Sequence, residues 1–123
     1  MILVDTSVWV DHLRHGDERL TGLLERELVL VHPHVIGELS LGSLRQHDAM
    51  ISGLMDLPLS NVASDDEVLR FIAQQTLYGT GIGYVDAHLL AATRLTPGAT
   101  IWTRDKRLLA AAEKLSLAAR LFH

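Results

Sequence analysis

The amino-terminal stretch MILVDTSVW, residues 1–9, decides the fold. Its apolar run predicts a buried strand at residues 1–4, and the polar residues that follow predict the start of a helix. Asp5 then stands where the strand ends and the helix begins. A carboxylate in such apolar surroundings is costly to bury unless it is paired or binds a cation. Asp5 is therefore the first candidate functional residue.

Short apolar runs alternate with helical patterns along the rest of the chain. Further strands are predicted at residues 28–31 and 99–103, with an extended segment at 57–62 and a last short strand at 117–122. The predicted helices span residues 5–15, 17–27, 33–43, 47–55, 64–77, 84–95 and 108–115; the fifth opens with a capping box. Strands that alternate with helices form a parallel sheet covered by helices, so the predicted fold class is α/β.

Size and composition indicate one domain, residues 1–123. With 48% hydrophobic and 21% charged residues, the chain has the composition of a soluble globular protein. It has no cysteine, which excludes disulfides and thiolate metal sites and fits a cytoplasmic protein. The apolar runs are too short to cross a bilayer, so we expect neither a membrane segment nor a signal peptide. A net charge of −4 argues against a basic coat for nucleic acid, but not against a nuclease.

Three more acidic residues stand in comparable positions. Glu38 lies in the apolar segment VIGEL, Asp86 precedes a run of apolar residues, and Asp105 follows a predicted strand. Ligands of open parallel sheets bind at the carboxyl ends of the strands, where we expect Asp5 and Asp105. Glu38 and Asp86 are expected on helices beside that edge. The four are far apart in the chain, so only the fold can bring them together.

Clustered carboxylates stay ionised only when a cation compensates their charge. Ligand sets made of oxygen alone favour Mg²⁺ or Mn²⁺ over zinc. Mg²⁺ in proteins usually also binds substrate phosphates, and a pair of such ions clamps an in-line phosphoryl displacement. The four acids therefore predict hydrolysis of a phosphodiester.

Taken singly, three of the acids have simpler explanations. Asp5 is a good helix N-cap, Asp86 suits the first turn of a helix, and Asp105 suits a turn. Glu38 has the weakest simple explanation, because its neighbours are apolar and a solvated face is less easily assumed.

Other polar residues receive structural interpretations. His32 and His34 are interpreted as loop and first-turn residues, and His88 is expected to point away from Asp86. The glycines within residues 79–83 resemble those of a phosphate-binding loop, but no strand clearly precedes them and no Lys-Ser/Thr follows. This segment is therefore interpreted as a flexible lead into the next helix.

Three basic residues, Arg104, Lys106 and Arg107, cluster near the fourth acid. They form either a solvated turn or a set of contacts that position phosphates without reading sequence. Trp9 and Trp102 are expected in the core, with base stacking as the alternative.

Four motifs in order resemble the acidic motifs of PIN-domain ribonucleases, and most closely those of the VapC toxins of bacterial toxin–antitoxin pairs. They are DTSVW at residues 5–9, GEL at 37–39, GYVDA at 83–87 and TRD at 103–105. The resemblance covers the whole chain. It implies a small PIN-like three-layer α/β/α domain with a short, mostly parallel central sheet, and cleavage of RNA that depends on Mg²⁺ or Mn²⁺.

The resemblance also implies residue roles. The catalytic and metal-site acids are Asp5, Glu38, Asp86 and Asp105. The hydroxyl positions that support the metal or its waters are Ser7 and Thr103. The glycines before Asp86 and the histidine after it are less usual for the family, which leaves the local shape there open.

The partners implied by the resemblance are an RNA substrate, a VapB-like antitoxin that inserts a tail segment into the acidic groove, and a second copy of the chain. Apolar residues in the middle helices favour a homodimer, because they exceed what one face of a small sheet needs: Leu41, Met50, Leu54 and Met55. Two alternatives remain open. One is a PIN-type nuclease of RNA processing, and the other is a catalytically silent module whose acids bind a partner's arginines.

Overall fold

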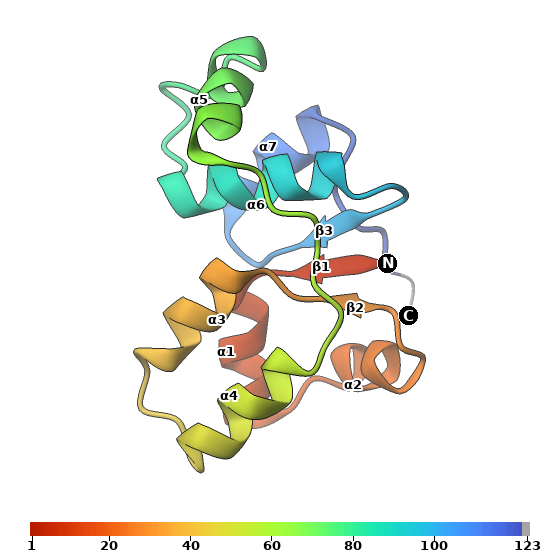
Figure 1. Cartoon of the computed structure of the whole chain (residues 1–123). Coiled ribbons are helices and arrows are strands. Elements are labelled where there is room, and N and C mark those ends of the chain that lie inside the picture. Colours follow the sequence, from red (N-terminus) through yellow and green to blue (C-terminus); the bar gives the residue numbers. More distant parts are fainter. Residues whose placement is uncertain (122–123) are drawn as a thin grey trace.

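The computed structural model describes residues 1–121, in which three parallel strands form a sheet of order β2-β1-β3. The strands are β1 (Ile2–Val4), β2 (Val29–Leu30) and β3 (Thr100–Trp102). The helices are α1 (Thr6–His15), α2 (Glu18–Glu25), α3 (Pro33–Ser40), α4 (His47–Met55), α5 (Asp65–Gln74), α6 (Tyr84–Leu95) and α7 (Lys106–Lys114). Figure 1 shows α1 to α4 on one side of the strands and α5 to α7 on the other. The predicted three-layer α/β/α fold is confirmed.

The order of the strands determines where a site can form. The central strand β1 pairs with β2 through Leu3 and Leu30, and with β3 through Val4 and Trp102. The chain moves from β1 to β2 and then crosses to the opposite edge for β3. Consequently α1, which follows β1, and α7, which follows β3, leave the sheet on opposite sides (Figure 1). Such a reversal opens a crevice at the carboxyl ends of the strands.

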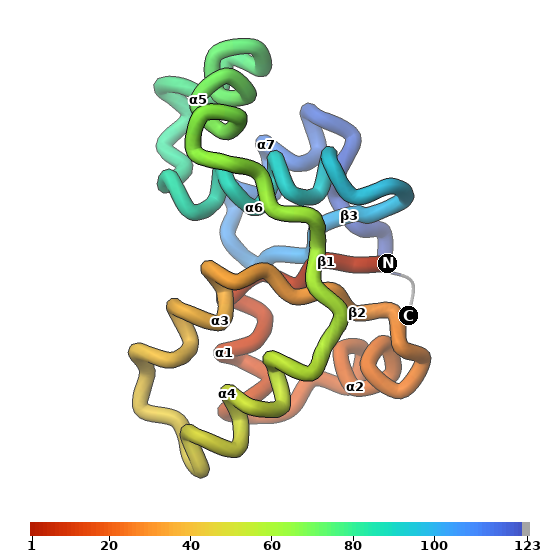
Figure 2. Tube along the Cα trace, in the orientation of Figure 1, coloured from red at the N-terminus to blue at the C-terminus, as the bar shows by residue number. Residues whose placement is uncertain are grey.

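Two isolated parallel bridges extend the sheet. Leu59 pairs with Val31 beside β2, within the extended segment predicted at 57–62, and Ala118 pairs with Ile101 beside β3. Figure 2 shows the chain between α4 and α5 passing the strands on its way from one helical layer to the other.

The strand predicted at residues 117–122 is corrected by the structure. Only a bridge forms there, held by hydrogen bonds of 2.8 Å between the backbone of Ile101 and residues 117 and 119. The backbone turns at Ser116, whose φ is 60°, and only a short segment then runs alongside β3. Residue 122, the end of the predicted strand, lies outside the described residues.

Helix boundaries differ from the predictions by up to three residues. The predicted helix 64–77 ends at Gln74, because the chain reverses at Thr76 with a φ of 54°. The predicted helix 108–115 begins two residues earlier, at Lys106, because Asp105 caps it. The capping box at the start of α5 is present. These differences arise where a side chain or a positive φ ends a pattern that periodicity alone continues.

The core lies on both sides of the sheet. Leu3, Val4 and Ile101 are almost completely buried in the strands, and both tryptophans are buried as predicted. Between residues 87 and 93 every side chain of α6 is buried, which makes α6 the central helix of its layer.

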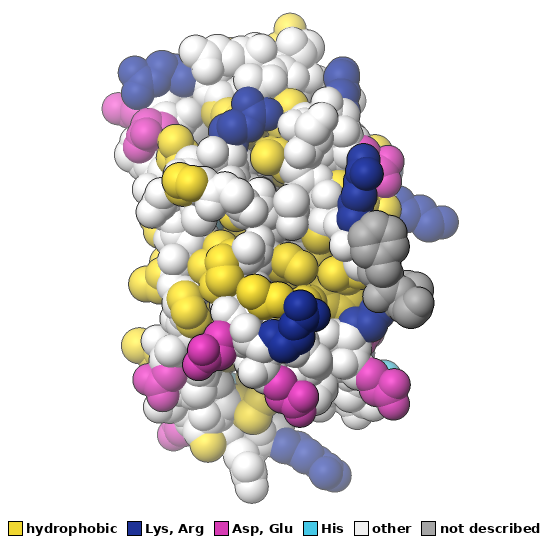
Figure 3. All heavy atoms as spheres, turned by 90° about the vertical axis from the view of Figure 1, so that its right-hand side faces the viewer, with side chains coloured by type: hydrophobic (Ala, Val, Ile, Leu, Met, Phe, Trp, Pro, Cys, Tyr) yellow, Lys and Arg dark blue, Asp and Glu magenta, His cyan; other side chains and the backbone are white. Residues whose placement is uncertain are grey.

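The surface carries apolar side chains in several places. Of the residues expected at a dimer interface, Leu41 and Met55 are strongly exposed, whereas Leu54 is only 4% exposed and belongs to the core. Figure 3 shows a band of hydrophobic side chains on the side of the molecule where the strands begin, away from their carboxyl ends. Within residues 1–121, no helix is long and apolar enough to cross a bilayer.

Candidate functional site

Asp5 is a buried carboxylate held by two hydroxyl groups. The backbone of Asp5 starts α1, yet its side chain makes no capping bond. Instead, Oδ2 accepts hydrogen bonds from Ser7 Oγ at 2.7 Å and Thr103 Oγ1 at 2.8 Å. Asp5 is only 5% exposed. The side chain therefore has a different role from the simple N-cap, and its two hydroxyl partners are those that the motif resemblance identifies.

The same hydroxyls fix the loop after β3. Thr103 Oγ1 accepts a hydrogen bond from the Asp105 amide, and Ser7 Oγ accepts one from the Arg104 amide, each at 3.0 Å. Each hydroxyl thus donates to Asp5 and accepts from the loop, which uses its single proton and one lone pair. Residues that are 96 and 98 positions apart in the chain are joined in one network.

Asp105 serves as the N-cap of α7. Its Oδ1 accepts hydrogen bonds from the amides of Arg107 and Leu108, both at 2.9 Å. The sequence alone suggested a turn as the simple explanation for Asp105. The structure shows a more specific role, because Asp105 caps a helix. Because the cap uses Oδ1, the position of the carboxylate at the crevice is set by the helix itself.

Asp86 lies in the first turn of α6 and is partly buried. Its Oδ2 accepts a hydrogen bond from the Gly83 amide at 3.2 Å. Burial raises the pKa of the Asp86 carboxyl above its ordinary value, and the negative charges of Asp5, Asp105 and Glu38 raise it further, against the opposing effect of the Gly83 bond. The other three acids therefore lie within electrostatic range of Asp86.

Glu38 differs from the expectation. It lies on the exposed face of α3, between the buried Val35 and Leu39, so its apolar sequence neighbours do not surround it in space. Its Oε1 accepts a hydrogen bond of 2.7 Å from Thr6 Oγ1, at the start of α1. The contact joins residues 32 positions apart, and for this reason the role of Thr6 was not visible in the sequence.

The four acids are near one another without forming a closed set of ligands. Within residues 1–121, no three side chains of His, Cys, Asp or Glu are grouped closely enough to hold a metal ion by themselves. The chemistry of the donors still fits a hard divalent cation, because all four are carboxylates and their charges already disfavour ionisation of Asp86. Mg²⁺ commonly keeps several waters and needs few direct protein ligands, which suits such an open arrangement.

The basic residues near the fourth acid divide into two kinds. Arg104 is paired with Asp11, at 2.9 Å from Nε to Oδ2, and also with Asp17. Its guanidinium therefore joins the loop to α1 and to the cap of α2. Lys106 and Arg107 are exposed at the start of α7. All three residues are exposed, and within residues 1–121 Arg104 is the one of the three that forms ion pairs.

The histidines interpreted as structural form a cluster instead of standing apart. His32 caps α3 by accepting the His34 amide at 3.0 Å, as a loop and first-turn residue should. His88 Nε2 lies 3.1 Å from Asp65 Oδ1, so it is bonded to α5, away from the Asp86 carboxylate as predicted. The ring centroids of His34 and His88 are 4.6 Å apart.

A groove of about 1010 Å³ opens beside Glu38, between α1, α3 and the segment that leads to α4. Its lining combines apolar side chains with the basic residues Arg14 and Arg45. The apolar lining includes Val10, Leu13, Leu39, Leu44 and Met50. Patterns within single elements do not predict the shape of this groove, because its walls come from elements that are separate in the chain.

Comparison with known proteins agrees with this geometry. The family model described as PIN domain matches residues 2–114, a range that contains all four acids and the hydroxyls that bond Asp5. The chain is 49% identical over 118 residues to a protein named Ribonuclease VapC32 in two strains of Mycobacterium tuberculosis, CDC 1551 / Oshkosh and ATCC 25618 / H37Rv. Each match covers 96% of this chain and 95% of the relative. The chain therefore belongs to the PIN domain family, as a VapC-type member.

Proposed function

We propose that this protein is a metal-dependent endoribonuclease that acts as the toxin of a toxin–antitoxin pair. The observation that carries the proposal is that the charges of Asp5, Glu38 and Asp105 act on Asp86, in a chain that matches a ribonuclease over nearly its whole length. The proposed ion is Mg²⁺ or Mn²⁺, and the proposed place of action is the cytoplasm, where RNA substrates occur.

The proposed roles follow from the surroundings of each acid. Asp5, Asp86, Asp105 and Glu38 would hold the cation. When bound, the ion supplies Lewis-acid stabilisation of phosphate charge and lowers the pKa of water. The hydroxyls on Asp5 fix the orientation of that carboxylate, because each is held in turn by a loop amide. Lys106 and Arg107, both exposed at the start of α7, are the proposed phosphate contacts.

Asp86→Asn tests the proposal. The amide keeps the shape of the side chain and can still accept the Gly83 bond, but it removes the charge that binds the ion. We expect the loss of Mg²⁺-dependent RNA cleavage. We also expect higher stability without metal, because like-charge repulsion is relieved; about 1 kcal/mol would raise Tm by roughly 4 °C in a domain of this size.

Cleavage of total RNA, with mapping of the cut ends, and thermal melts with and without Mg²⁺ give the two results. Asp56→Asn, at the exposed end of α4, is a matched control that should change neither result. Full activity of pure Asp86→Asn protein would refute the assignment.

A VapB-like antitoxin is the proposed protein partner, and the groove beside Glu38 is its proposed docking surface. The apolar lining suits an inserted segment, and the nearby acids suit an arginine on it. The product of a neighbouring reading frame should inhibit cleavage, and Leu44→Asp in the groove should weaken that inhibition without abolishing cleavage. Unchanged inhibition of this variant would argue against the groove.

A homodimer is proposed on the strength of Leu41 and Met55, which are 89% and 66% exposed. Exposed apolar side chains of this size commonly mark interfaces when they are grouped. Light scattering should give the mass of a dimer for the wild type and of a monomer for Leu41→Asp. Leu69→Asp, at a leucine that is 57% exposed in the opposite helical layer, serves as the control. A wild-type monomer at high micromolar concentration would contradict the proposal.

A further inference from the structure

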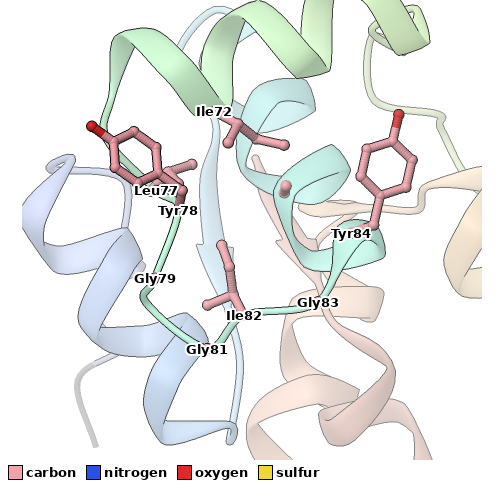
Figure 4. A pocket seen from close by; sticks show the side chains of 9 residues that line it. Ile72, Leu77, Tyr78, Gly79, Gly81, Ile82, Gly83 and Tyr84 are labelled. Atoms are coloured by element: carbon pink, nitrogen blue, oxygen red, sulfur yellow. The ribbon is translucent and has the colours of Figure 1, made fainter.

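A small apolar hollow lies between the end of α5, the glycine segment at residues 79–83 and the start of α6 (Figure 4). Its volume is about 230 Å³, below the range of pockets for drug-sized ligands, which starts at about 300 Å³. Its apolar lining is formed by Ile72, Leu77, Ile82 and Ala87. Figure 4 shows Tyr78 and Tyr84 on opposite sides of Ile82. We call this hollow the base pocket.

The base pocket adjoins the acids. Gly83 lines the pocket, and its amide donates to Asp86 Oδ2. Ala87, in the wall of the pocket, directly follows Asp86 in α6. The pocket is therefore linked to the partly buried Asp86 carboxylate by the amide of Gly83, one of its lining residues.

A cation lies at the same edge. Gly81 has a φ of +85°, and a Cβ atom there would come within 3.0 Å of Arg107 Nη1 and 3.1 Å of Arg107 Cδ. Glycine thus allows the arginine side chain to lie flat against the loop. The segment that lines the pocket therefore contacts Asp86 through Gly83 and the exposed Arg107 through Gly81, and a guanidinium is well suited to a phosphate.

Tyr84 is fixed before any ligand arrives. Its hydroxyl donates to Asp65 Oδ1 at 3.0 Å, and its ring meets His88 edge-on with centroids 4.7 Å apart. It nevertheless remains 47% exposed, and Tyr78 is 68% exposed. An exposed aromatic ring that is held in place is a ready surface for stacking, because little side-chain entropy is lost on binding.

We infer that the base pocket receives one unstacked nucleobase of the RNA substrate, from a nucleotide adjacent to the cleaved phosphate. The inference rests on the proposed function and deepens it, by assigning the pocket and its tyrosines to substrate selection. Proteins recognise single-stranded RNA by placing splayed bases against aromatic rings. The apolar face of a base fits the hollow, while the linked phosphates reach the arginine on one side and, on the other, the cation that the acids would hold.

Binding of RNA can be measured apart from cleavage. The probe is a short single-stranded RNA, together with a series in which each nucleotide in turn is abasic, and the protein is the full chain carrying Asp5→Asn. Fluorescence anisotropy gives the affinity, and NMR follows the methyl signals of Ile82 and Leu77. We expect RNA to shift these signals and one abasic position to weaken binding by roughly tenfold, the usual effect of one stacked base.

Two substitutions of Tyr84 separate stacking from structure. Tyr84→Leu removes the ring, whereas Tyr84→Phe keeps the ring; both lose the bond to Asp65. Only the leucine variant should lose affinity, and it should bind normal RNA no better than the critical abasic RNA. Equal losses in both variants would identify a structural role and overturn the inference. Tyr78→Ala removes the other exposed ring and should also lower the affinity for RNA. Because Tyr78 is more exposed than Tyr84, this variant should affect folding less.

The results also separate this inference from the proposed function. RNA that binds and shifts the Ile82 signal, with no cleavage by the wild type and Mg²⁺, supports the pocket and refutes the nuclease. RNA that is cleaved by the wild type, while every abasic RNA binds equally and the signals stay unchanged, refutes the pocket alone. An absence of RNA binding overturns both.

Discussion

At the scale of single residues, the site depends on hydroxyl groups as much as on acids. The Thr103 side chain is 6% exposed and connects the Asp5 carboxylate with the amide of Asp105. A buried polar group that loses its partner costs about 1–3 kcal/mol, more than an average hydrogen bond contributes. Loss of the Thr103 hydroxyl would therefore remove one of the two hydroxyl bonds to the buried Asp5 carboxylate and the acceptor of the Asp105 amide.

Thr103→Val should lower the free energy of unfolding by about 1–3 kcal/mol, because its shape is retained and its hydroxyl is lost. Urea denaturation measures this change. Thr103→Ser keeps the hydroxyl and should retain most of the cleavage activity, whereas the valine variant should lose it. Equal activity and stability of the two variants would show that the hydroxyl does not orient Asp5.

At the scale of elements, one side chain serves both a helix and the crevice. Asp105 begins α7 through two amide bonds, and it also raises the pKa of Asp86 through its charge. Helix capping requires an oxygen acceptor, while binding of a cation requires the charge. Because asparagine caps helices about as well as aspartate, the two roles can be tested separately.

Asp105→Asn should leave the stability of the protein within about 0.5 kcal/mol of the wild type, and should reduce Mg²⁺-dependent cleavage. Asp105→Ala should also reduce cleavage, and its free energy of unfolding should fall by about 1 kcal/mol, because the cap is then absent. Chemical denaturation and RNA cleavage report the two roles independently. If the asparagine variant cleaved RNA normally, Asp105 would be a helix cap alone.

At the scale of the whole molecule, a buried histidine makes folding sensitive to acid. His32 is completely buried, and burial lowers its pKa from 6.5 to about 4, with a smaller effect from the charges of His34 and His88. The unfolded chain binds a proton below pH 6.5, whereas the folded protein does so only near pH 4. The stability that the lowered pKa of His32 contributes is therefore complete above pH 6.5 and is lost as the pH falls toward 4.

His32→Asn should remove this part of the pH dependence. Asparagine can still cap α3 but does not titrate, although its smaller size lowers stability at every pH. The difference in unfolding free energy between wild type and variant should shrink between pH 6.5 and 4, by at most about 3 kcal/mol. Asp86, whose pKa is raised, acts in the opposite direction in both proteins, so the comparison isolates His32. A constant difference would contradict the prediction.

Local patterns in the sequence determined the parallel α/β fold and the position of each acid relative to its own strand or helix. The strand at residues 2–4 and the capping box of α5 depend on neighbours within a few positions. For this reason they were predicted closely, and Asp5 was recognised at the end of its strand.

Only the tertiary structure decided what surrounds those acids. The network on Asp5, the bond from Thr6 to the exposed Glu38 and the base pocket all join segments that are distant in the chain. Periodicity describes which face of an element is apolar, but not which other element covers it. The exposure of Glu38 and the burial of His32 follow from packing between elements, and packing is the physical reason that these features were absent from the sequence-based prediction.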